Sequence, residues 1–332
     1  MNKKTTGLVL GKFMPFHKGH ELLIQFANNF VDQLYVVLDP IKNESIPINK
    51  RGEWIKKTIP EVEVLYLTKY HPQDPKEHPD FWQIWQHSLL SLLPEKPDYV
   101  FASESYGFKL ADILGAKFIP VDLNRENVPI SATKIKANLY DNWHYLCDVV
   151  KLDFLMRICI FGPESTGKTT LCQQLATYYH TVYVPEYARF LIETKGNINK
   201  QDMIDIARGQ IALEKAIAPK ANRILFCDTD PLTTTIWSKW LFNDCSEDII
   251  YLAREKKYDL YLLTDIDLEW QSDQVRYFPE KRKEFLTDCI ECLESNNRKY
   301  SIISGTGEKR IENAINVIEI QVNEYFNYFL KY

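Results

Sequence analysis

The amino-acid sequence predicts an α/β protein with two doubly wound domains, each built on a parallel β-sheet. Short β-branched runs alternate with segments of helical periodicity, a pattern typical of right-handed βαβ units. The alternation starts afresh at Met156–Phe161. The length of 332 residues also suggests two domains, at roughly 150 residues per domain. We therefore expect one domain at 1–150 and a second at 151–332.

The first half contains five strand-like runs separated by helical segments. The expected strands are Thr6–Leu10, Leu34–Leu38, Glu63–Leu67, Tyr99–Ala102 and Lys117–Val121. The expected helices are Lys18–Phe30, Lys50–Thr58, Pro79–Leu93 and Tyr106–Leu114. A helical connector is expected at Asn142–Leu155, which contains neither glycine nor proline.

The second half repeats the pattern and ends in a long amphipathic helix. Its expected strands are Met156–Phe161, Ile224–Cys227, Leu260–Leu263 and Ser301–Ser304. The last segment places apolar residues at steps of three and four, which predicts a single apolar helical stripe. Its members are Ile311, Ile315, Ile318, Val322, Tyr325 and Phe329. We expect this helix to cover its own sheet; a seam between copies of the chain, giving a homo-oligomer, is the alternative.

Composition narrows the class of protein. Hydrophobic residues make up 45% and charged residues 26%, as in soluble globular proteins. A net charge of -5 argues against general nucleic-acid binding, which needs a basic surface. The sequence has no apolar stretch of about 20 residues and no signal-peptide core, so we expect no membrane association and a cytoplasmic location.

The seven cysteines do not suggest a disulfide framework, because their number is odd and the chain is long. Cys289 and Cys292 have CxxC spacing. We interpret them as two small residues one turn apart on a helix, in preference to a redox pair or half of a zinc site.

The turn Gly11–His20 (GKFMPFHKGH) lies between the first strand and the first helix. Open α/β sheets bind ligands at the carboxyl ends of their strands. His17 and His20 are three residues apart at a helix start, where exposed N–H groups favour anions. Gly19 would let a nucleotide approach the main chain closely. A loop with two surface histidines is the alternative interpretation.

This motif resembles that of the HxGH nucleotidylyltransferase superfamily. Ile130–Lys136 (ISATKIK) is similar to the ISxTxIR signature of the same superfamily. Ser131 and Thr133 at a helix start can cap the helix and bind phosphate. Lys136 replaces the usual arginine, which keeps the charge but loses the planar fork, so the grip on the triphosphate is expected to be weaker or different.

Further segments resemble the NadR family of fused nicotinamide-nucleotide enzymes. They are Phe81–Trp85 (FWQIW), Ser103–Gly107 (SESYG) and Val121–Ile130 (VDLNRENVPI). The resemblance implies a Rossmann-like nicotinamide mononucleotide adenylyltransferase, in which the phosphate of the mononucleotide attacks the α-phosphate of ATP. The implied catalytic residues are His17, His20 and Lys12, and the implied ATP-binding residues are Gly11, Phe13, Gly19, Ser131, Thr133 and Lys136. Trp82 or Trp85 stacks on a cationic nicotinamide ring or packs in the core; both interpretations stay open.

The turn Gly162–Thr169 (GPESTGKT) is a P-loop that follows a strand and opens a helix. Lys168 is expected to reach the β- and γ-phosphates, and Thr169 to ligate Mg²⁺. The other residues expected around the phosphates are Gly162, Glu164, Ser165, Thr166, Gly167 and Thr170. Asp228 follows a strand and is expected to hold Mg²⁺ or accept a proton. Asp230 would point to the same side if the chain stays extended; a polar turn before a proline is the alternative for both.

The second half resembles the ribosylnicotinamide kinase domain of the NadR family. The matching motifs are the P-loop, Pro185–Arg189 (PEYAR), Asp228–Pro231 (DTDP) and Thr264–Asp267 (TDID). The resemblance implies a P-loop nucleoside-kinase-like fold that phosphorylates the 5′-hydroxyl of nicotinamide riboside, with Asp228 as our choice of base. The implied riboside-side residues are Glu186, Arg189, Asp228 and Asp230. Arg276 is expected on a lid over the transferred phosphoryl group, unless that segment is a solvated helix, and Arg310 in an adenine-side loop.

The two expected reactions fit together, because the kinase product is the adenylyltransferase substrate. The expected outcome is NAD from nicotinamide riboside and two molecules of ATP with Mg²⁺. Three alternatives remain: an active kinase beside a weak adenylyltransferase, another HxGH nucleotidylyltransferase fused to an unrelated P-loop kinase, and a non-enzymatic nucleotide sensor or repressor. Members of the family can carry an N-terminal helix-turn-helix domain. Because the first strand starts near Thr6, we expect no DNA binding.

Overall fold

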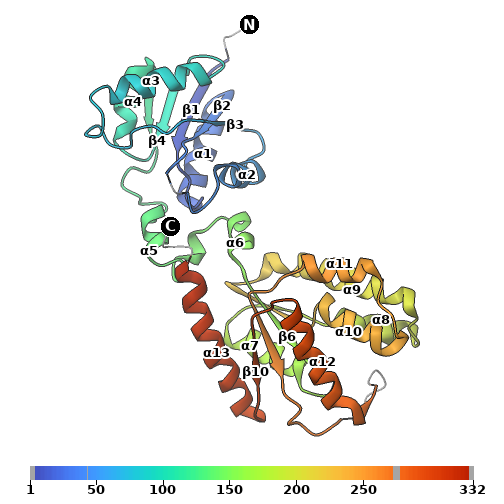
Figure 1. Cartoon of the computed structure of the whole chain (residues 1–332). Helices are drawn as coiled ribbons and strands as arrows, with labels where there is room; N and C mark the ends of the chain where they lie inside the picture. The colour runs from blue at the N-terminus through green and yellow to red at the C-terminus, as the bar shows by residue number, and fades with distance from the viewer. Residues whose placement is uncertain (1–3, 43, 272–276, 329–332) are drawn as a thin grey trace. The chain divides into compact units, whose positions relative to one another are not determined.

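The structure is a computed structural model that describes residues 4–42, 44–271 and 277–328 (Figure 1). The internal contacts divide the chain into two compact units. Unit 1 contains the described residues up to Asp153 together with those from Phe326 onward, and unit 2 is Phe154–Tyr325. Within the described residues, each unit has one five-stranded sheet in which every strand pair is parallel. The predicted α/β fold class is confirmed.

The sheet of unit 1 has the strand order β3-β2-β1-β4-β5. Its strands are β1 (Thr6–Gly11), β2 (Gln33–Leu38), β3 (Glu63–Tyr66), β4 (Tyr99–Ala102) and β5 (Lys117–Pro120). The chain extends from β1 to one side as far as β3 and then crosses to the other side as β4. In open α/β sheets this change of direction leaves a crevice at the carboxyl end of the central strand. The turn after β1 therefore lies where such a sheet binds its ligand.

Helices cover both faces of the unit 1 sheet. They are α1 (Lys18–Phe30), α2 (Ile48–Thr58), α3 (Phe81–Leu92), α4 (Tyr106–Leu114) and α5 (Ala132–Ala137). Neighbouring residues of a strand point to opposite faces. Val100 of β4 packs in the core formed with α3 and α4, whereas the ring of Phe101 lies 6.2 Å from that of Phe26 on α1. Two covered faces explain why the strands are almost uninterrupted apolar runs.

The connector predicted at Asn142–Leu155 is not one helix. It forms a 3-10 turn at Trp143–Tyr145 and then the short helix α6 (Asp148–Phe154). Leu146 interrupts the helix with an extended backbone and pairs with His17 in an isolated antiparallel bridge. A tertiary contact thus overrides a helical propensity that nothing in the local sequence opposes.

The sheet of unit 2 has the order β10-β9-β6-β8-β7, with β6 as the central strand. The strands are β6 (Met156–Phe161), β7 (Tyr183–Val184), β8 (Ile224–Asp228), β9 (Leu260–Thr264) and β10 (Tyr300–Ile303). β7 is absent from the sequence prediction because it is only two residues long. The turn after β6 and the end of β8 lie beside each other, because these strands are neighbours.

Several helices surround this sheet. They are α7 (Lys168–Tyr178), α8 (Tyr187–Lys195), α9 (Lys200–Ile217), α10 (Pro231–Phe242), α11 (Glu247–Glu255), α12 (Arg282–Ser295) and α13 (Gly307–Tyr328), with 3-10 turns at Ala218–Lys220 and Pro279–Lys281. A second apolar core around Met203, Ile206 and Ile249 joins α8, α9, α10 and α11. Residues of α8, α9 and α10 from this group line a pocket together with the P-loop.

The remaining sequence expectations concern α12 and α13. Ile318 and Val322 of the α13 stripe are buried by the chain itself, as expected of a helix that covers its own protein; Phe329 lies outside the described residues. Cys289 and Cys292 lie on α12 as free thiols. Across the described ranges, histidine, cysteine and carboxylate side chains form no group of three or more suited to a metal ion. None of the described helices combines the length and apolarity needed to cross a membrane.

Candidate active sites

The HxGH turn of unit 1 is organised by His17, the N-cap residue of α1. Its Nδ1 atom accepts hydrogen bonds from the main-chain N–H groups of Gly19 (3.1 Å) and His20 (3.3 Å). Because Nδ1 accepts, the neutral ring carries its proton on Nε2, which becomes a donor toward a ligand. These amides were expected to face an anion, but the histidine ring occupies them. An anion at this turn must therefore be bound mainly by side chains.

The two histidines form a stacked, uncharged pair in which His17 is buried and His20 is half-buried. Their rings stack with centroids 3.6 Å apart, and the ring of Phe13 meets that of His20 edge-on at 5.0 Å. His17 is only 4% exposed, and burial, together with the positive charge of Arg125, lowers its pKa to about 4. Burial and the neighbouring His17 also hold the pKa of His20 well below its usual value. Near pH 7 both imidazoles therefore act as neutral hydrogen-bonding groups.

Positive charge near the turn comes from lysine and arginine side chains. Burial lowers the pKa of Lys136, and the charges of Lys12 and Arg51 lower it further, so these three cations lie near one another. Arg125 acts on both histidines and is ion-paired with Glu104 at 3.1 Å. Such a group of like charges favours a bound polyanion. Sequence reasoning missed Arg125 and Arg51, because neither belongs to a motif in which a positive charge was expected.

Arg51 is fully buried and stabilises the turn through hydrogen bonds to main-chain carbonyls. Its guanidinium donates to the carbonyl oxygens of Ile46 (3.1 Å) and Asp39 (3.2 Å), and it also contacts the Lys12 carbonyl and the Glu44 carboxylate. One side chain on α2 thus holds the loops that follow β1 and β2. It fixes the main chain of Lys12, whose own side chain is exposed.

The other residues expected at this site lie as follows. Gly11 ends β1, and a Cβ atom on it would lie 2.8 Å from the Phe13 ring. A Cβ atom on Gly19 would lie 3.1 Å from the His17 ring. Ser131 caps α5 by accepting from the N–H of Lys134 at 3.2 Å, and Thr133 on that helix is exposed. Close ring packing in the turn therefore leaves no room for a side chain at Gly11 and little at Gly19, whether or not ATP is bound.

Trp85 is part of the core of unit 1. It is 6% exposed, its indole N–H donates to the Pro72 carbonyl at 3.0 Å, and its ring lies 4.7 Å from that of His71. Trp82 is half-buried at the edge of the same core. These contacts satisfy the packing interpretation for Trp85. Stacking of a nicotinamide ring on either indole stays a prediction.

The P-loop of unit 2 has a backbone conformation that depends on two glycines at positive φ. Gly162 and Gly167 have φ angles of 134° and 75°, a region that favours glycine. A Cβ atom on Gly162 would lie 2.7 Å from the Thr264 hydroxyl. No described side chain caps α7 at Gly167, so the amides of the first turn remain for phosphate oxygens. Lys168 Nζ donates to the Pro163 carbonyl at 2.8 Å and folds over the loop.

Asp228 lies at the end of β8, directly beside the P-loop. It is fully buried, and its Oδ2 atom accepts from the Thr169 hydroxyl at 2.5 Å. Its Oδ1 atom is also buried and has no hydrogen-bond partner within the described residues. Burial and the negative charge of Glu186 raise the pKa of Asp228 to about 6, against the opposing charges of Lys168 and Arg189. The residues expected to line the riboside and metal region are thus close to the P-loop lysine.

Asp230 differs from its expected placement beside Asp228. Thr229 between them has a φ angle of 71°, so the chain is not extended. Asp230 instead caps α10, accepting from the Thr233 N–H at 2.9 Å, and it accepts from the Tyr261 hydroxyl at 2.9 Å. Both oxygens of this buried carboxylate are therefore occupied by protein donors, although the residue borders the pocket.

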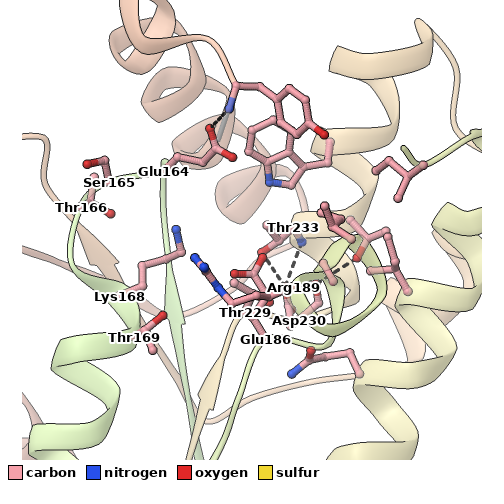
Figure 2. Close-up of a pocket in the computed structure, with 18 of the residues that line it drawn as sticks. Glu164, Ser165, Thr166, Lys168, Thr169, Glu186, Arg189, Thr229, Asp230 and Thr233 are labelled. Carbon is pink, nitrogen blue, oxygen red and sulfur yellow. Dashed lines mark hydrogen bonds between the residues drawn. The ribbon is translucent and has the colours of Figure 1, made fainter. Parts of the chain in front are cut away.

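A single pocket brings together the P-loop, Glu186, Arg189 and a wall of apolar side chains (Figure 2). The apolar residues are Ile192, Ile198, Met203, Ile206, Trp237, Leu241 and Tyr277. The rings of Trp237 and Tyr277 lie 6.4 Å apart at 59°. Sequence reasoning missed this wall, because its members come from α8, the loop after it, α9, α10 and the segment before α12. A phosphate-binding end and an aromatic end suit a phosphate donor and a small aromatic nucleoside.

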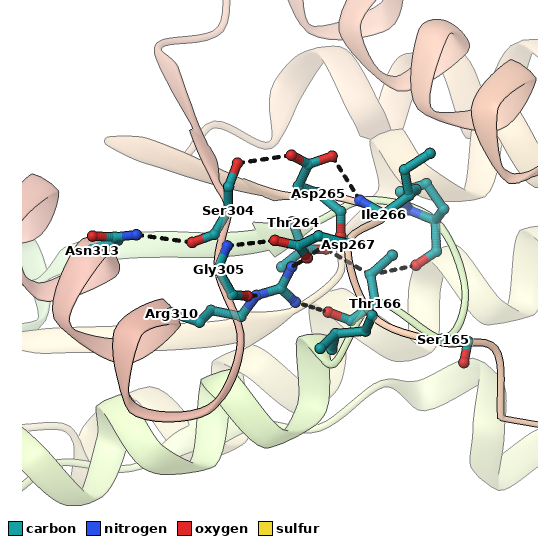
Figure 3. Close-up of polar contacts among 12 residues, drawn as sticks. Ser165, Thr166, Thr264, Asp265, Ile266, Asp267, Ser304, Gly305, Arg310 and Asn313 are labelled. Carbon is teal, nitrogen blue, oxygen red and sulfur yellow. Dashed lines mark hydrogen bonds and ion pairs between the residues drawn. The ribbon is translucent and has the colours of Figure 1, made fainter.

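Arg310 supports the P-loop from the side of β9 and β10 (Figure 3). It is 4% exposed and donates to the carbonyls of Gly305 (2.8 Å) and Asp265 (3.0 Å). It also contacts the Thr166 carbonyl and the Asp267 carboxylate. This arrangement indicates a support for the loop rather than the expected contact with adenine. Arg276, expected on a lid, lies outside the described residues.

The comparisons with known proteins cover both units. A family model described as an AAA domain matches residues 157–310. The trifunctional NAD biosynthesis/regulator protein NadR of Escherichia coli (strain K12) is 28% identical over 321 residues, which are 90% of this chain and 78% of that protein. The nicotinamide-nucleotide adenylyltransferase of Pyrococcus abyssi is 25% identical over 156 residues, covering 46% of this chain and 83% of that enzyme.

Solved structures share the fold of the whole chain. A NadR protein in complex with NR superposes with a TM-score of 0.75 at 22% identity, covering 97% of this chain and 96% of that one. A NadR protein in complex with NAD and AMP-PNP gives a TM-score of 0.73 at the same identity. The chain is therefore similar in sequence to NadR proteins across both the HxGH turn and the P-loop, and it shares its fold with the solved NadR structures.

Proposed function

We propose that the chain is a bifunctional enzyme of NAD synthesis. Unit 2 phosphorylates nicotinamide riboside with ATP, and unit 1 transfers an adenylyl group from ATP to the resulting mononucleotide, giving NAD and pyrophosphate. The observation that carries this proposal is that relatives named for NAD biosynthesis match the chain across both sites, each of which retains its phosphate-binding turn. The shared product and substrate give one chain two consecutive reactions.

In the kinase reaction, the P-loop binds ATP and the aromatic wall receives the nicotinamide riboside. Asp228 is our choice of base, because its pKa near 6 suits proton transfer near neutral pH. It accepts the proton of the 5′-hydroxyl while that oxygen forms a bond to the γ-phosphorus, and the bond to the bridging β-γ oxygen breaks to release ADP. Lys168 and the free amides of α7 stabilise the charge on the transferred group.

Magnesium fits the same edge of the pocket. Thr169 and Asp228 are in hydrogen-bond contact, and the buried Oδ1 atom of Asp228 has no described partner. Thr169 would coordinate the ion directly and Asp228 through a bound water, so that the carboxylate could still accept the substrate proton. Mg²⁺ keeps several waters and binds mainly through the nucleotide phosphates. Bound there, Mg²⁺ would neutralise charge on the β- and γ-phosphates.

In the adenylyl transfer, unit 1 supplies positioning and charge stabilisation. A phosphate oxygen of the mononucleotide forms a bond to the α-phosphorus of ATP, and the bond to the bridging α-β oxygen breaks to release pyrophosphate. Neutral His17 and His20 donate hydrogen bonds, and Lys12 and Lys136 provide positive charge. We assign the ATP side of the site to Gly11, Phe13, Gly19, Ser131 and Thr133. No covalent intermediate on the protein is needed.

A second candidate, a kinase with a weak adenylyltransferase, is favoured by Lys136. This lysine stands where the superfamily signature has arginine, and burial lowers its pKa. A single ammonium cannot bind phosphate oxygens bidentately. If this loss limits the reaction, Lys136→Arg will raise the adenylyltransferase rate at low ATP, with the kinase unchanged.

The deciding experiment supplies the purified chain with nicotinamide riboside and Mg²⁺-ATP and separates mononucleotide from NAD by chromatography. We expect mononucleotide first and NAD after it. Supplying the mononucleotide directly tests unit 1 alone; absence of NAD in that reaction would refute the adenylyltransferase. A panel with CTP and other nucleosides separates this proposal from another HxGH transferase joined to an unrelated kinase. Because ATP and the mononucleotide are held inside cells, we also expect the enzyme to act in the cytoplasm.

A further inference from the structure

The P-loop of unit 2 contains a carboxylate, Glu164, in a loop built to bind a polyanion. A carboxylate directed at the phosphates would repel them, and the repulsion grows where water is excluded. In the structure the Oε2 atom of Glu164 instead accepts the main-chain N–H of Tyr277 at 2.7 Å (Figure 2). The charge of Glu164 is therefore used in a contact with the chain that precedes α12.

Ser165 makes a parallel contact. Its hydroxyl oxygen accepts the main-chain N–H of Gln271 at 2.7 Å. Arg282, the first residue of α12, donates to the Ser165 carbonyl at 3.4 Å and to the Leu268 carbonyl at 2.9 Å. The variable positions of the P-loop are thus joined to residues on both sides of Tyr277. The phosphate loop and this part of the pocket wall are one hydrogen-bonded structure.

The contact at Tyr277 sets the position of an aromatic ring. Tyr277 borders the same pocket as Glu164, and its ring packs against Trp237 at 6.4 Å. Trp237 is itself held by Phe285, with ring centroids 4.5 Å apart. One side of the Tyr277 ring is therefore fixed by packing, and its main chain is fixed by a hydrogen bond to a charged acceptor, the stronger class of such bonds.

We propose that Glu164 is a positioning residue for the nucleoside: it holds the Tyr277 main chain and so sets the aromatic wall against which the riboside binds. The proposal rests on the kinase function of unit 2 and deepens it. Glu164 acts through Tyr277 and not on the phosphates. A P-loop residue thereby determines the affinity of the enzyme for the other substrate.

The test is a steady-state comparison of Glu164→Ala and Glu164→Gln in the full chain. In Glu164→Ala the KM for nicotinamide riboside should rise about tenfold, the equivalent of one hydrogen bond to a charged group, while the KM for ATP stays within about twofold. Glu164→Gln should restore the KM for riboside, because its amide oxygen also accepts the Tyr277 N–H. Equal behaviour of the two variants, with a changed KM for ATP, would show that the charge acts on the phosphates and would overturn the proposal.

A double-mutant cycle tests whether Glu164 acts through Tyr277. Tyr277→Ala should raise the KM for riboside, and adding Glu164→Ala to it should change the KM little, because the ring it positions is gone. Independent, additive effects contradict the proposal. Glu312→Ala, an exposed carboxylate on α13, is the matched control and should leave both KM values unchanged.

The kinase proposal and the positioning role fail differently. A wild-type chain that does not phosphorylate nicotinamide riboside overturns both. An active wild type in which Glu164→Ala keeps its KM for riboside overturns the positioning role alone.

Discussion

The two units offer different hydrogen-bond donors to a phosphate at equivalent places in their sheets. In each, a turn follows the central strand, β1 or β6, and opens a helix, α1 or α7. In unit 1, the ring of His17 accepts the first amides of α1, so few main-chain donors remain. In unit 2, the N-cap residue of α7 is Gly167, and no described side chain caps the helix. The amides of its first turn therefore stay available to a phosphate. One turn therefore depends on its side chains and the other on its backbone.

This difference changes what each site tolerates. The HxGH turn depends on the stacked rings of His17 and His20, and burial lowers their pKa values so that both stay neutral. The P-loop needs glycines at positive φ and the support of Arg310 from outside. Only Lys168 and Thr169 of the P-loop are expected to act through their side chains toward the nucleotide. Substitutions in each unit should therefore separate the two activities and show which kind of donor each uses.

The largest effect is expected from Lys168→Ala. Loss of its charge on the transferred phosphoryl group should lower the kinase rate about 10²–10³-fold, the range seen for one preorganised donor. NAD formation from supplied mononucleotide should not change, because that reaction uses unit 1. Lys257→Ala, an exposed lysine in the same unit, is the control. Loss of both activities in Lys168→Ala would contradict two independent sites.

Replacements of His17 separate its donor role from its capping role. Asparagine can still cap α1 but has no Nε2–H donor, whereas alanine lacks both. Both variants should lower the adenylyltransferase rate by about 10²-fold. Only His17→Ala should also lose about 1 kcal/mol of folding stability, measured by denaturant unfolding. An active His17→Asn would show that the Nε2 donor is not used.

Arg310→Met tests the support of the P-loop. The change keeps much of the side-chain volume but leaves the carbonyls of Gly305 and Asp265 without their donor. We expect about 2 kcal/mol less stability for unit 2 and a higher KM for ATP in the kinase reaction. Adenylyltransferase activity is the internal control. If stability falls but the KM for ATP does not rise, the loop does not depend on Arg310 for its shape.

The smallest effect near neutral pH is a pH dependence of stability that originates in unit 1. The folded pKa of His17 is about 4 and its ordinary value is 6.5, so the unfolded chain binds the proton first as the pH falls. Stability should therefore decrease from pH 6.5 toward pH 4, by at most about 1.4 kcal/mol per pH unit for this group, and be independent of it above pH 6.5. His17→Asn should show a shallower slope. An unchanged slope would mean that His17 is not held neutral by burial.

Much of the fold was predictable, because the relevant signals are local. The strands of unit 1 and its first four helices were located within two residues, since apolar periodicity within about ten residues encodes them. β7 was missed because two residues carry no periodicity. The connector at Asn142–Leu155 was wrong because the pairing of Leu146 with His17 joins residues far apart in the chain.

The sequence by itself determined the fold class and located the HxGH turn and the P-loop, because each turn is a contiguous motif between a strand and a helix. Only the tertiary structure decided what surrounds them. Arg51 and the pair formed by Trp237 and Tyr277 reach the sites from distant segments, so no spacing in the sequence predicts them. Arg310 was expected near the nucleotide, but its support of the P-loop was not. Even the role of Glu164, a residue inside a motif, depended on a partner more than a hundred residues away.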